Sequence, residues 1–430
     1  MGGALRDSLI GRSSSDWDLA TSALPEQTVA VFDHAVYENR FGTVAVRRDG
    51  AEYQITTFRS DHDYADHRRP HRVEFGTSIE ADLARRDFTM NALAWGAEGA
   101  GSAPALVDPF GGVADATSGI IRAVGEPGLR FREDALRMIR AVRFAATLGF
   151  TIEPATLDAI RAESALVGHL SGERIAVELD KMLGADRPSE GLRLLAETGL
   201  LGEISADLAA QRGVAQNKIA GEDLWDHTLR TVDATTNRPV VRLAALLHDI
   251  GKPATAADGH FYGHETIGAE LAGALLDRLH VPRSTSERVI LLVRQHMFRY
   301  DPSWGDAAVR RFIGKIGLDA LDELFALREA DNEGSGVPRN ADDLDELRSR
   351  VAAEQTAGLV IDRRDLAIDG DDLIAELGLK PGPVLGRIID ELLERVVDDR
   401  ALNDRPTLML LARDAASRLG ADPAPPSGGR

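Results

Sequence analysis

Two aspartates near the start of the chain have the spacing of a metal-binding pair. If residues 16–18 form a strand, the two-residue period of the strand puts Asp16 and Asp18 on one face. Two carboxylates on one face repel each other unless a divalent cation lies between them, and Mg²⁺ prefers such oxygen ligands. The preceding Gly2 and Gly3 would let backbone N–H groups approach a phosphate, which Arg6 could also reach. These groups together would serve phosphoryl or nucleotidyl transfer; the alternative is a surface turn with two solvated aspartates.

A second set of residues has the composition of a buried metal site. The set comprises His227, His248, Asp249, His264, His296 and Asp331. His248 and Asp249 are adjacent at the end of an apolar run and precede Gly251, which can end a helix. Imidazole and carboxylate suit Zn²⁺, Mn²⁺, Ni²⁺ or Fe²⁺. The alternative is that these are hydrogen-bonded structural histidines on helix faces.

The composition limits the classes of protein to consider. Lys and Arg number 50 against 69 Asp and Glu, and the net charge of −19 repels nucleic acid at long range. The positive charge for an anionic substrate must therefore be local, and residues 122–143 supply it with six arginines against three acids. The absence of Cys excludes disulfides and thiolate sites. No apolar run approaches the ~18 residues of a membrane span, and no secretory leader is visible, so we expect a cytoplasmic protein.

The elements that must position these residues change in character along the chain. Residues 29–34 and 43–47 are rich in β-branched types, and residues 52–58 alternate, so all three are predicted strands. Residues 108–112 read as a loop. From about residue 118 onward, apolar residues recur at helical spacing. The fold class expected is an α/β N-terminal region followed by an almost wholly α-helical chain.

Five blocks of sequence, read together, resemble the class II CCA-adding tRNA nucleotidyltransferases. This family is related to bacterial poly(A) polymerases within the polymerase-β-like superfamily. The blocks are GGxxRD, DxDxAT, RRDFTMNALA, VDPFGG and REDALRMIRAVRFA, and the resemblance covers residues 1 to about 200 in order. It implies a nucleotidyltransferase palm over residues 1–117 and a helical neck and body, with a nucleotide-selecting helix, over residues 118–215.

The resemblance implies a role for each matching residue. Asp16 and Asp18 match the catalytic pair that binds Mg²⁺, and Asp134 and Arg137 match the side chains that read the incoming base. The remaining nucleotide-binding positions are Gly3 and Arg6 for the triphosphate, Arg86, Asp87 and Asn91 for the sugar and phosphates, and Arg140 and Arg143 on the basic face of the selecting helix. Cytosine and adenine both present an exocyclic amine and a ring-nitrogen acceptor, so one carboxylate–guanidinium pair could serve both and reject U and G.

Two departures from the family pattern stand out. Members begin some tens of residues earlier, which implies that a native N-terminal segment is missing from this chain. Members often carry a carboxylate in the strand before the TTFR run, where this chain has Gln54. A neutral amide oxygen would support a metal only weakly, and Glu52 is the nearest carboxylate on that strand face.

The histidine and aspartate set resembles the HD superfamily of metal-dependent phosphohydrolases. The match covers residues 224–331 and rests on HDIGK and GHExxGA. It implies an HD domain over residues 216–333 with a divalent transition metal or Mg²⁺, followed by a helical tail over 334–420 and a disordered end over 421–430. The bound metal would activate a water for attack on a phosphate ester.

The two resemblances imply template-independent addition of C, C and A to the 3′ end of tRNA. The substrates would be CTP and ATP, with pyrophosphate as the product, and the HD region could add a phosphohydrolase activity. Three alternatives stay open: a poly(A) polymerase or an enzyme adding only A or only C; an HD phosphohydrolase with a vestigial transferase half; and a non-catalytic RNA-binding protein. The oligomeric state does not follow from the sequence.

Overall fold

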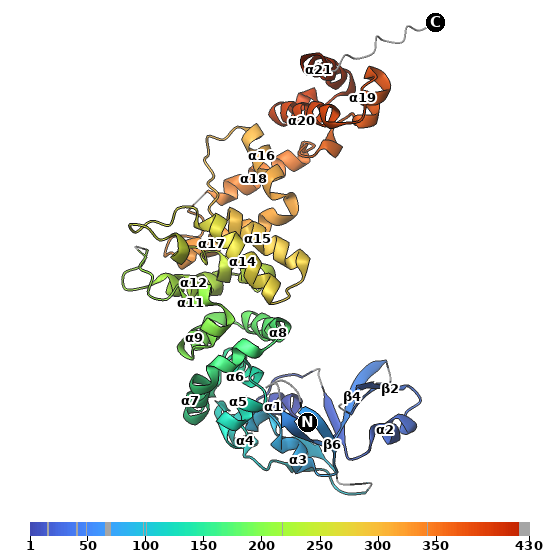
Figure 1. Cartoon of the computed structure of the whole chain (residues 1–430), viewed down its shortest axis with the longest axis vertical. Helices are drawn as coiled ribbons and strands as arrows, with labels where there is room; N and C mark the ends of the chain where they lie inside the picture. The colour runs from blue at the N-terminus through green and yellow to red at the C-terminus, as the bar shows by residue number, and fades with distance from the viewer. Residues whose placement is uncertain are drawn as a thin grey trace. The chain divides into compact units, whose positions relative to one another are not determined.

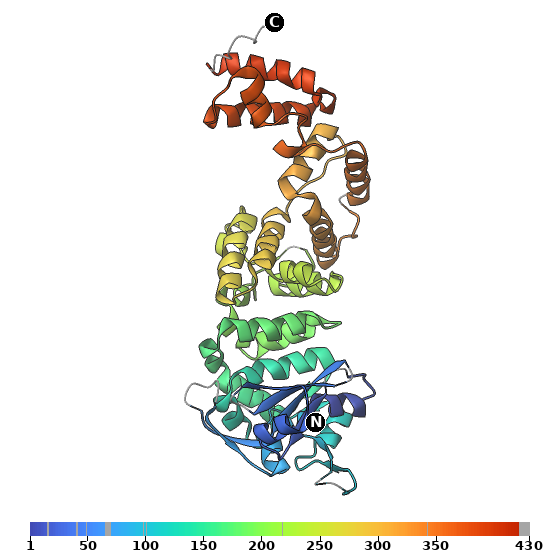
Figure 2. The same ribbon diagram turned by 90° about the vertical axis from the view of Figure 1, so that its right-hand side faces the viewer.

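The structure, a computed structural model, divides into two compact units, Met1–Ile290 and Leu291–Arg430, each considered by itself. It describes residues 1–14, 17–39, 42–48, 50–64, 70–97, 99, 101–216, 218–341 and 343–420. In the first unit the strands lie in the N-terminal part, drawn in blue, and the green to yellow remainder is helical (Figures 1 and 2). The expected fold class, an α/β region followed by a helical chain, is confirmed.

The largest sheet has four strands in the order β1-β4-β3-β2. Its strands are β1 (Asp18–Thr21), β2 (Ala35–Asn39), β3 (Thr43–Arg48) and β4 (Ala51–Thr57). β1 runs parallel to β4, and the other pairs are antiparallel. Val44 and Val46 alternate with less buried residues along β3 and are almost fully buried, as expected for a sheet with one covered face. Helix α2 (Pro25–Val31) packs against β2, β3 and β4 (Figure 1).

The strand predicted over residues 29–34 is wrong. Residues 29–31 form the last turn of α2, which starts with Pro25, and the next strand begins only at Ala35. Proline suits the first turn of a helix because its missing N–H would have no partner there. The side chain of Gln27 accepts a hydrogen bond from the Leu24 N–H at 2.8 Å and closes the helix start. These local signals outweigh the β-propensity of the valines.

Short elements complete the α/β region. They are α1 (Gly3–Leu9), β5 (Arg59–Tyr64), β6 (Pro70–Phe75), α3 (Ile79–Ala84), the 3-10 helix η1 (Thr89–Asn91), β7 (Ala94–Gly96), β8 (Ala105–Val107), α4 (Gly112–Ser118) and β9 (Ile120–Ile121). A small core of buried Leu83, Ala92, Ala94 and Val124 brings together α3, the end of η1, β7 and the segment after β9. The predicted loop over residues 108–112 leads into α4, where a side chain on Gly112 would stand 2.0 Å from the Thr89 carbonyl oxygen. Only glycine allows α4 to pack this closely against η1.

Where the structure describes it, the rest of the first unit consists of helices, their connecting loops and the two-residue strand β10 (Thr151–Ile152). Its helices are α5 (Pro127–Glu133), α6 (Leu136–Leu148), α7 (Pro154–Glu163), η2 (Ser164–His169), α8 (Gly172–Leu183), α9 (Pro188–Glu197), α10 (Leu200–Ile204), α11 (Ala206–Ala209), α12 (Leu224–Ala234), α13 (Pro239–Leu247), η3 (Pro253–Thr255), α14 (His264–Arg278) and α15 (Arg283–Gln295), which crosses into the second unit. The helix α6 packs against both α8 and α9.

The second unit is helical where the structure describes it. Its further elements are α16 (Asp306–Ile316), α17 (Leu318–Gly334), α18 (Leu344–Thr356), η4 (Arg363–Asp365), α19 (Gly370–Leu377), α20 (Pro383–Asp398), η5 (Arg400–Leu402) and α21 (Arg405–Arg418). Leu373, Leu392 and Leu408 belong to a buried core that joins α19, α20 and α21. Among the described residues of both units, no helix combines the length and apolar character that a membrane crossing requires.

The sequence-based boundaries after residues 117, 215 and 333 stay predictions. The expected disordered end over residues 421–430 lies outside the described residues.

Candidate functional site

The first strand of the sheet presents one of the two predicted metal-binding carboxylates. Asp18 begins β1, is exposed, and lies opposite Gln54 of β4 in the parallel register. Directly opposed residues of paired strands project to the same face, so the Gln54 amide stands on the side of the sheet expected for the metal. The nearby Glu52 instead pairs with Arg47 at 3.2 Å. Asp16 lies outside the described residues, so the pairing of the two aspartates stays a prediction.

The glycine turn before α1 brings the chain against Arg86. Gly2 has a φ of +66°, and a side chain there would stand 2.5 Å from Nη1 of Arg86. The same Nη1 donates to the Asn91 carbonyl oxygen at 3.3 Å. Burial lowers the pKa of Arg86, which Asp82, 3.7 Å away, partly offsets. The positive φ at Gly2 thus favours glycine, and a side chain there would displace the end of Arg86, whereas Gly3 simply begins α1.

Arg6 and Asn91, which the sequence places 85 residues apart, are in direct contact. The buried Arg6 donates from Nη1 to Oδ1 of Asn91 at 2.7 Å. The Asn91 amide then donates to Oδ1 of Asp87 at 3.1 Å. Asp7 pairs with the other side of the Arg6 guanidinium at 2.8 Å. The structure therefore joins three of the predicted nucleotide-binding residues in one hydrogen-bonded chain.

Asp87 is the buried acidic centre of this chain. Its Oδ2 accepts two hydrogen bonds from Arg140 of α6, at 2.7 and 2.9 Å, and its Oδ1 accepts one from the Phe88 N–H at 2.8 Å. Burial raises the pKa of Asp87, but the charge of Arg140 and the hydrogen bonds from Asn91 and Arg140 outweigh it and lower the pKa to about 2. Asp87 is therefore a firmly ionised acceptor that links η1 to the predicted selecting helix.

The predicted base-reading residues stand at the start of α6. Asp134 accepts hydrogen bonds from the Leu136 N–H at 3.1 Å and from Nη2 of Arg174 at 2.8 and 3.1 Å. Arg137 donates to Glu133 at 2.7 Å and to the Arg85 carbonyl oxygen at 2.9 Å. Both side chains are fixed by neighbours before any base is present, which is the condition for a protein template.

Three residues of this site escaped the sequence analysis: Phe144, Glu178 and Arg174. The guanidinium carbons of Arg6, Arg140 and Arg143 lie 5.0, 5.4 and 3.9 Å from the centroid of the Phe144 ring. An arginine over an aromatic face is a favourable cation–π contact. Phe144 belongs to the motif block REDALRMIRAVRFA, but its apolar type at helical spacing does not distinguish it from an ordinary core residue.

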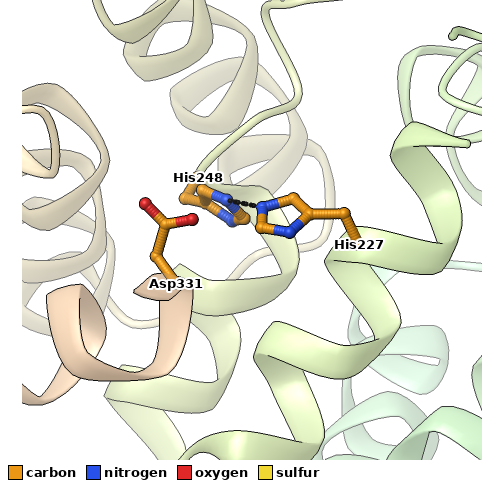
Figure 3. A group of neighbouring side chains, drawn as sticks. All are labelled: His227, His248 and Asp331. Atoms are coloured by element: carbon orange, nitrogen blue, oxygen red, sulfur yellow. Dashed lines mark hydrogen bonds between the residues drawn. The ribbon is translucent and has the colours of Figure 1, made fainter. Parts of the chain in front are cut away.

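The first unit also brings together four residues of the predicted HD set, all buried. Oδ2 of Asp249 lies 3.1 Å from Nε2 of His248 and 3.4 Å from Nε2 of His227, and Oδ1 lies 3.3 Å from Nε2 of His264. The Nε2 atoms of His227 and His248 are 3.2 Å apart (Figure 3). Burial raises the pKa of the Asp249 carboxyl, but His248 and Lys252 hold the pKa well below its usual range.

Backbone carbonyls fix which ring nitrogen faces the cluster. Nδ1 of His248 contacts the Ala245 oxygen at 2.8 Å, and Nδ1 of His264 contacts the Phe261 oxygen at 2.7 Å. A carbonyl oxygen only accepts, so Nδ1 carries a proton in both rings, and Nε2 is the nitrogen that faces the Asp249 carboxylate. Metal-binding histidines typically have this second hydrogen bond. The donor set therefore fits a divalent first-row metal.

The other two predicted HD residues, His296 and Asp331, belong to the second unit. Nδ1 of His296 contacts the Val293 oxygen at 2.7 Å, in the same manner as His248 and His264. Asp331 lies on α17, where Arg328 is 3.7 Å from its carboxylate. That these two residues complete the site stays a prediction.

Comparison with known families matches three parts of the chain. Residues 1–122 match the poly A polymerase head domain. Residues 149–211 match the family described as the probable RNA and SrmB-binding site of polymerase A, and residues 266–412 match the family described as a putative tRNA nucleotidyltransferase domain 2.

Individual relatives match over nearly the whole chain. The CCA-adding enzyme of Geobacillus kaustophilus is 34% identical over 415 residues, covering 94% of this chain and 90% of the relative. That of Streptococcus pyogenes serotype M5 is 33% identical over 418 residues, covering 96% and 92%. The crystal structure of the Bacillus stearothermophilus CCA-adding enzyme in complex with CTP has a TM-score of 0.71 and 31% identity, covering 97% of this chain and 93% of that one. This likeness in sequence and in fold shows that the chain is a nucleotidyltransferase and belongs to the family of CCA-adding enzymes.

Proposed function

We propose that this protein adds C, C and A in turn to the 3′ end of tRNA, using CTP and ATP and releasing pyrophosphate. The observation that carries the proposal is the hydrogen-bonded chain from Arg6 through Asn91 and Asp87 to Arg140. This chain of contacts links residues that we propose to bind the triphosphate, the sugar and the phosphates to α6, which carries Arg137 and follows Asp134. Related proteins whose structures contain CTP or tRNA share the fold.

In the proposed reaction, the 3′-hydroxyl of tRNA attacks the α-phosphate of the nucleotide. Arg6 and Arg86 neutralise phosphate charge, and Asp87, ionised and held by Arg140, accepts a hydrogen bond from the sugar. Asp134 accepts from the exocyclic amine of cytosine or adenine, while Arg137 donates to the ring nitrogen. Uracil and guanine present a carbonyl oxygen toward Asp134, so they are rejected.

A magnesium site at the strand face would complete the chemistry. The carboxylate of Asp18 is an oxygen donor of the type that Mg²⁺ prefers, and the neutral amide of Gln54 opposite it would add weak support. Asp16 with Asp18 would hold the ion. When bound, the ion supplies Lewis-acid stabilisation of the charge that develops at the phosphate.

Incorporation of single nucleotides tests the proposal. A tRNA that lacks CCA is incubated with CTP, ATP, UTP or GTP alone, and then with CTP and ATP together. The proposal expects two C additions from CTP alone and a complete CCA end from the pair. A long A tract from ATP alone would instead identify a poly(A) polymerase, and the addition of one base type only would identify an A-adding or C-adding enzyme.

A second candidate activity, hydrolysis of phosphate esters, rests on the buried cluster of His227, His248, Asp249 and His264. The orientation of each Nε2 toward one carboxylate supports a divalent metal there. We expect purified protein to contain a first-row metal by elemental analysis and His248→Ala to lose it. If the unsubstituted protein and His248→Ala hydrolyse a 2′,3′-cyclic nucleotide at equal rates, this activity is contradicted. CCA addition should be unaffected by the substitution.

A further inference from the structure

An exposed aromatic pair lies in the segment that leads to His264 of the buried cluster. Tyr262 is 82% exposed, the highest value for a large hydrophobic side chain among the residues that the structure describes. Its ring stacks on that of His260, with the ring centroids 5.3 Å apart and an angle of 23° between the planes. His260 is exposed as well. Neither ring takes part in the proposed transferase reaction or in the donor set of the cluster, so the pair requires another explanation.

A tight hairpin turn fixes the backbone before this pair. The N–H of Ala257 donates to the His260 carbonyl oxygen at 3.0 Å, and the N–H of His260 donates to the Ala257 carbonyl oxygen at 2.9 Å. Asp258 and Gly259 between them have φ values of +49° and +77°, and positive φ at both central residues is typical of a type I′ turn. The turn holds His260 in place, so the ring of Tyr262 rests on a preformed support.

Phe261 connects the same segment to the cluster. The ammonium group of Lys252 lies 5.6 Å from the centroid of the Phe261 ring and 2.6 Å from Oδ2 of Asp249. The Phe261 carbonyl oxygen accepts a hydrogen bond from Nδ1 of His264 at 2.7 Å. Because two residues of extended chain span at most about 7 Å, the backbone of Tyr262 is close to that of His264. The aromatic pair therefore stands beside the cluster.

Positive groups at the cluster suit the phosphate of a ligand that reaches the pair. Lys252 brings one ammonium group to Asp249, and Lys218 brings a second to within 3.2 Å of Nε2 of His227. Lys218 is an exposed residue whereas His227 is buried, so the cluster can be reached from the surface. Ammonium groups attract phosphate but do not recognise a base. An exposed aromatic face does so by stacking.

We propose that Tyr262, supported by His260, binds the base of a nucleoside phosphate whose phosphate group occupies the cluster. The proposal rests on the second candidate activity, hydrolysis of phosphate esters, and names the residue that would make this activity selective for nucleotides. Tyr262 contacts the substrate and holds it in position while the cluster acts on the phosphate. Since every base has a flat face, the site should accept different bases about equally well.

Equilibrium dialysis of the purified full-length protein with two ligands tests the proposal. Uridine 3′-phosphonate carries a base that the proposed transferase site rejects, and its phosphorus–carbon bond prevents hydrolysis; methylphosphonate carries no base. We expect Tyr262→Ala to raise the Kd for the uridine ligand about tenfold and to leave the Kd for methylphosphonate unchanged. Tyr262→Phe keeps the aromatic face, so it should bind both ligands as the unsubstituted protein does.

Tyr37→Ala is the matched control, because it makes the same change at an exposed tyrosine of β2, whose side chain is 42% exposed. Its Kd for the uridine ligand should equal that of the unsubstituted protein. Tyr262→Ala should also leave the KM for CTP and ATP in nucleotide addition unchanged, which checks that the fold and the transferase site are intact.

The outcomes separate the proposal from the activity on which it rests. If Tyr262→Ala leaves the Kd for uridine 3′-phosphonate unchanged, the aromatic pair does not bind the base. An equal rise in Kd for both ligands also overturns the proposal, since it would show that the substitution disturbs the cluster and not a contact with the base. If the unsubstituted protein binds neither ligand, the cluster holds no phosphate, so the second candidate activity fails first and the proposal fails with it.

Discussion

Removing the charge of Asp87 should destabilise the protein in a pH-dependent manner. The carboxyl is buried, accepts hydrogen bonds from Arg140 and Asn91, and has its pKa lowered from 3.8 to about 2. Since one pKa unit is worth about 1.4 kcal/mol, folding gains about 2.5 kcal/mol from keeping this group ionised. Because the folded-state pKa is the lower one, the gain is complete above about pH 5, falls to about half near pH 3 and is mostly lost near pH 2.

The assay is urea unfolding of the unsubstituted protein and of Asp87→Asn over this pH range. We expect a difference in unfolding free energy of about 2.5 kcal/mol at neutral pH that shrinks as the solution is acidified. Asp158→Asn is the control, because its ion pair with Arg161 is largely exposed and should contribute less than about 1 kcal/mol. A difference for Asp87→Asn that is below ~1 kcal/mol at neutral pH, or that does not change down to about pH 3, would refute the reasoning.

Three further substitutions probe the same pocket. Gly2→Ala should impair CTP addition far more than Gly11→Ala, because both glycines have positive φ but only the Gly2 side chain would meet another residue; equal activities would contradict this. Phe144→Leu, which removes the ring beneath three guanidiniums, should raise the KM for CTP several-fold and lower the unfolding free energy by about 1–3 kcal/mol, as measured by steady-state kinetics and urea unfolding. Arg174→Ala removes the hydrogen bonds that hold the predicted base-reading carboxylate of Asp134, so the preference for CTP over UTP in competition assays should fall by about tenfold. An unchanged preference would show that Asp134 does not need Arg174 to select the base.

The residues proposed for the nucleotide pocket come from the motif blocks, which carry them in order along the chain. The sequence could not show that Asp87 and Arg140, 53 residues apart, form an ion pair in which the carboxylate is buried. Contacts of this kind depend on how helices pack, and helical spacing gives only the face on which a residue lies. Glu178 and Arg174 were missed for the same reason, since they lie on a helix outside the motif blocks.

The errors in the fold prediction have a local cause. Residues 29–34 are β-rich, yet the proline and glutamine before them start a helix. In contrast, β3 and β4 lie where strands were predicted, β3 from its β-branched residues and β4 from its alternation. One face of β3 is buried, whereas β4 is exposed along its first four residues. Four of the six predicted HD residues lie together in the first unit, but the orientation of the imidazole rings toward Asp249 depends on carbonyl contacts that the sequence does not reveal.

The contact of three arginines with the ring of Phe144 affects their conformational entropy in the unbound protein. Long arginine side chains normally sample many rotamers, and a ligand that binds them must freeze that motion. Here the aromatic face and the surrounding carboxylates immobilise three of them while the chain folds. That entropy loss is therefore met during folding, and a nucleotide bound at the proposed site would not have to restrict these three side chains again.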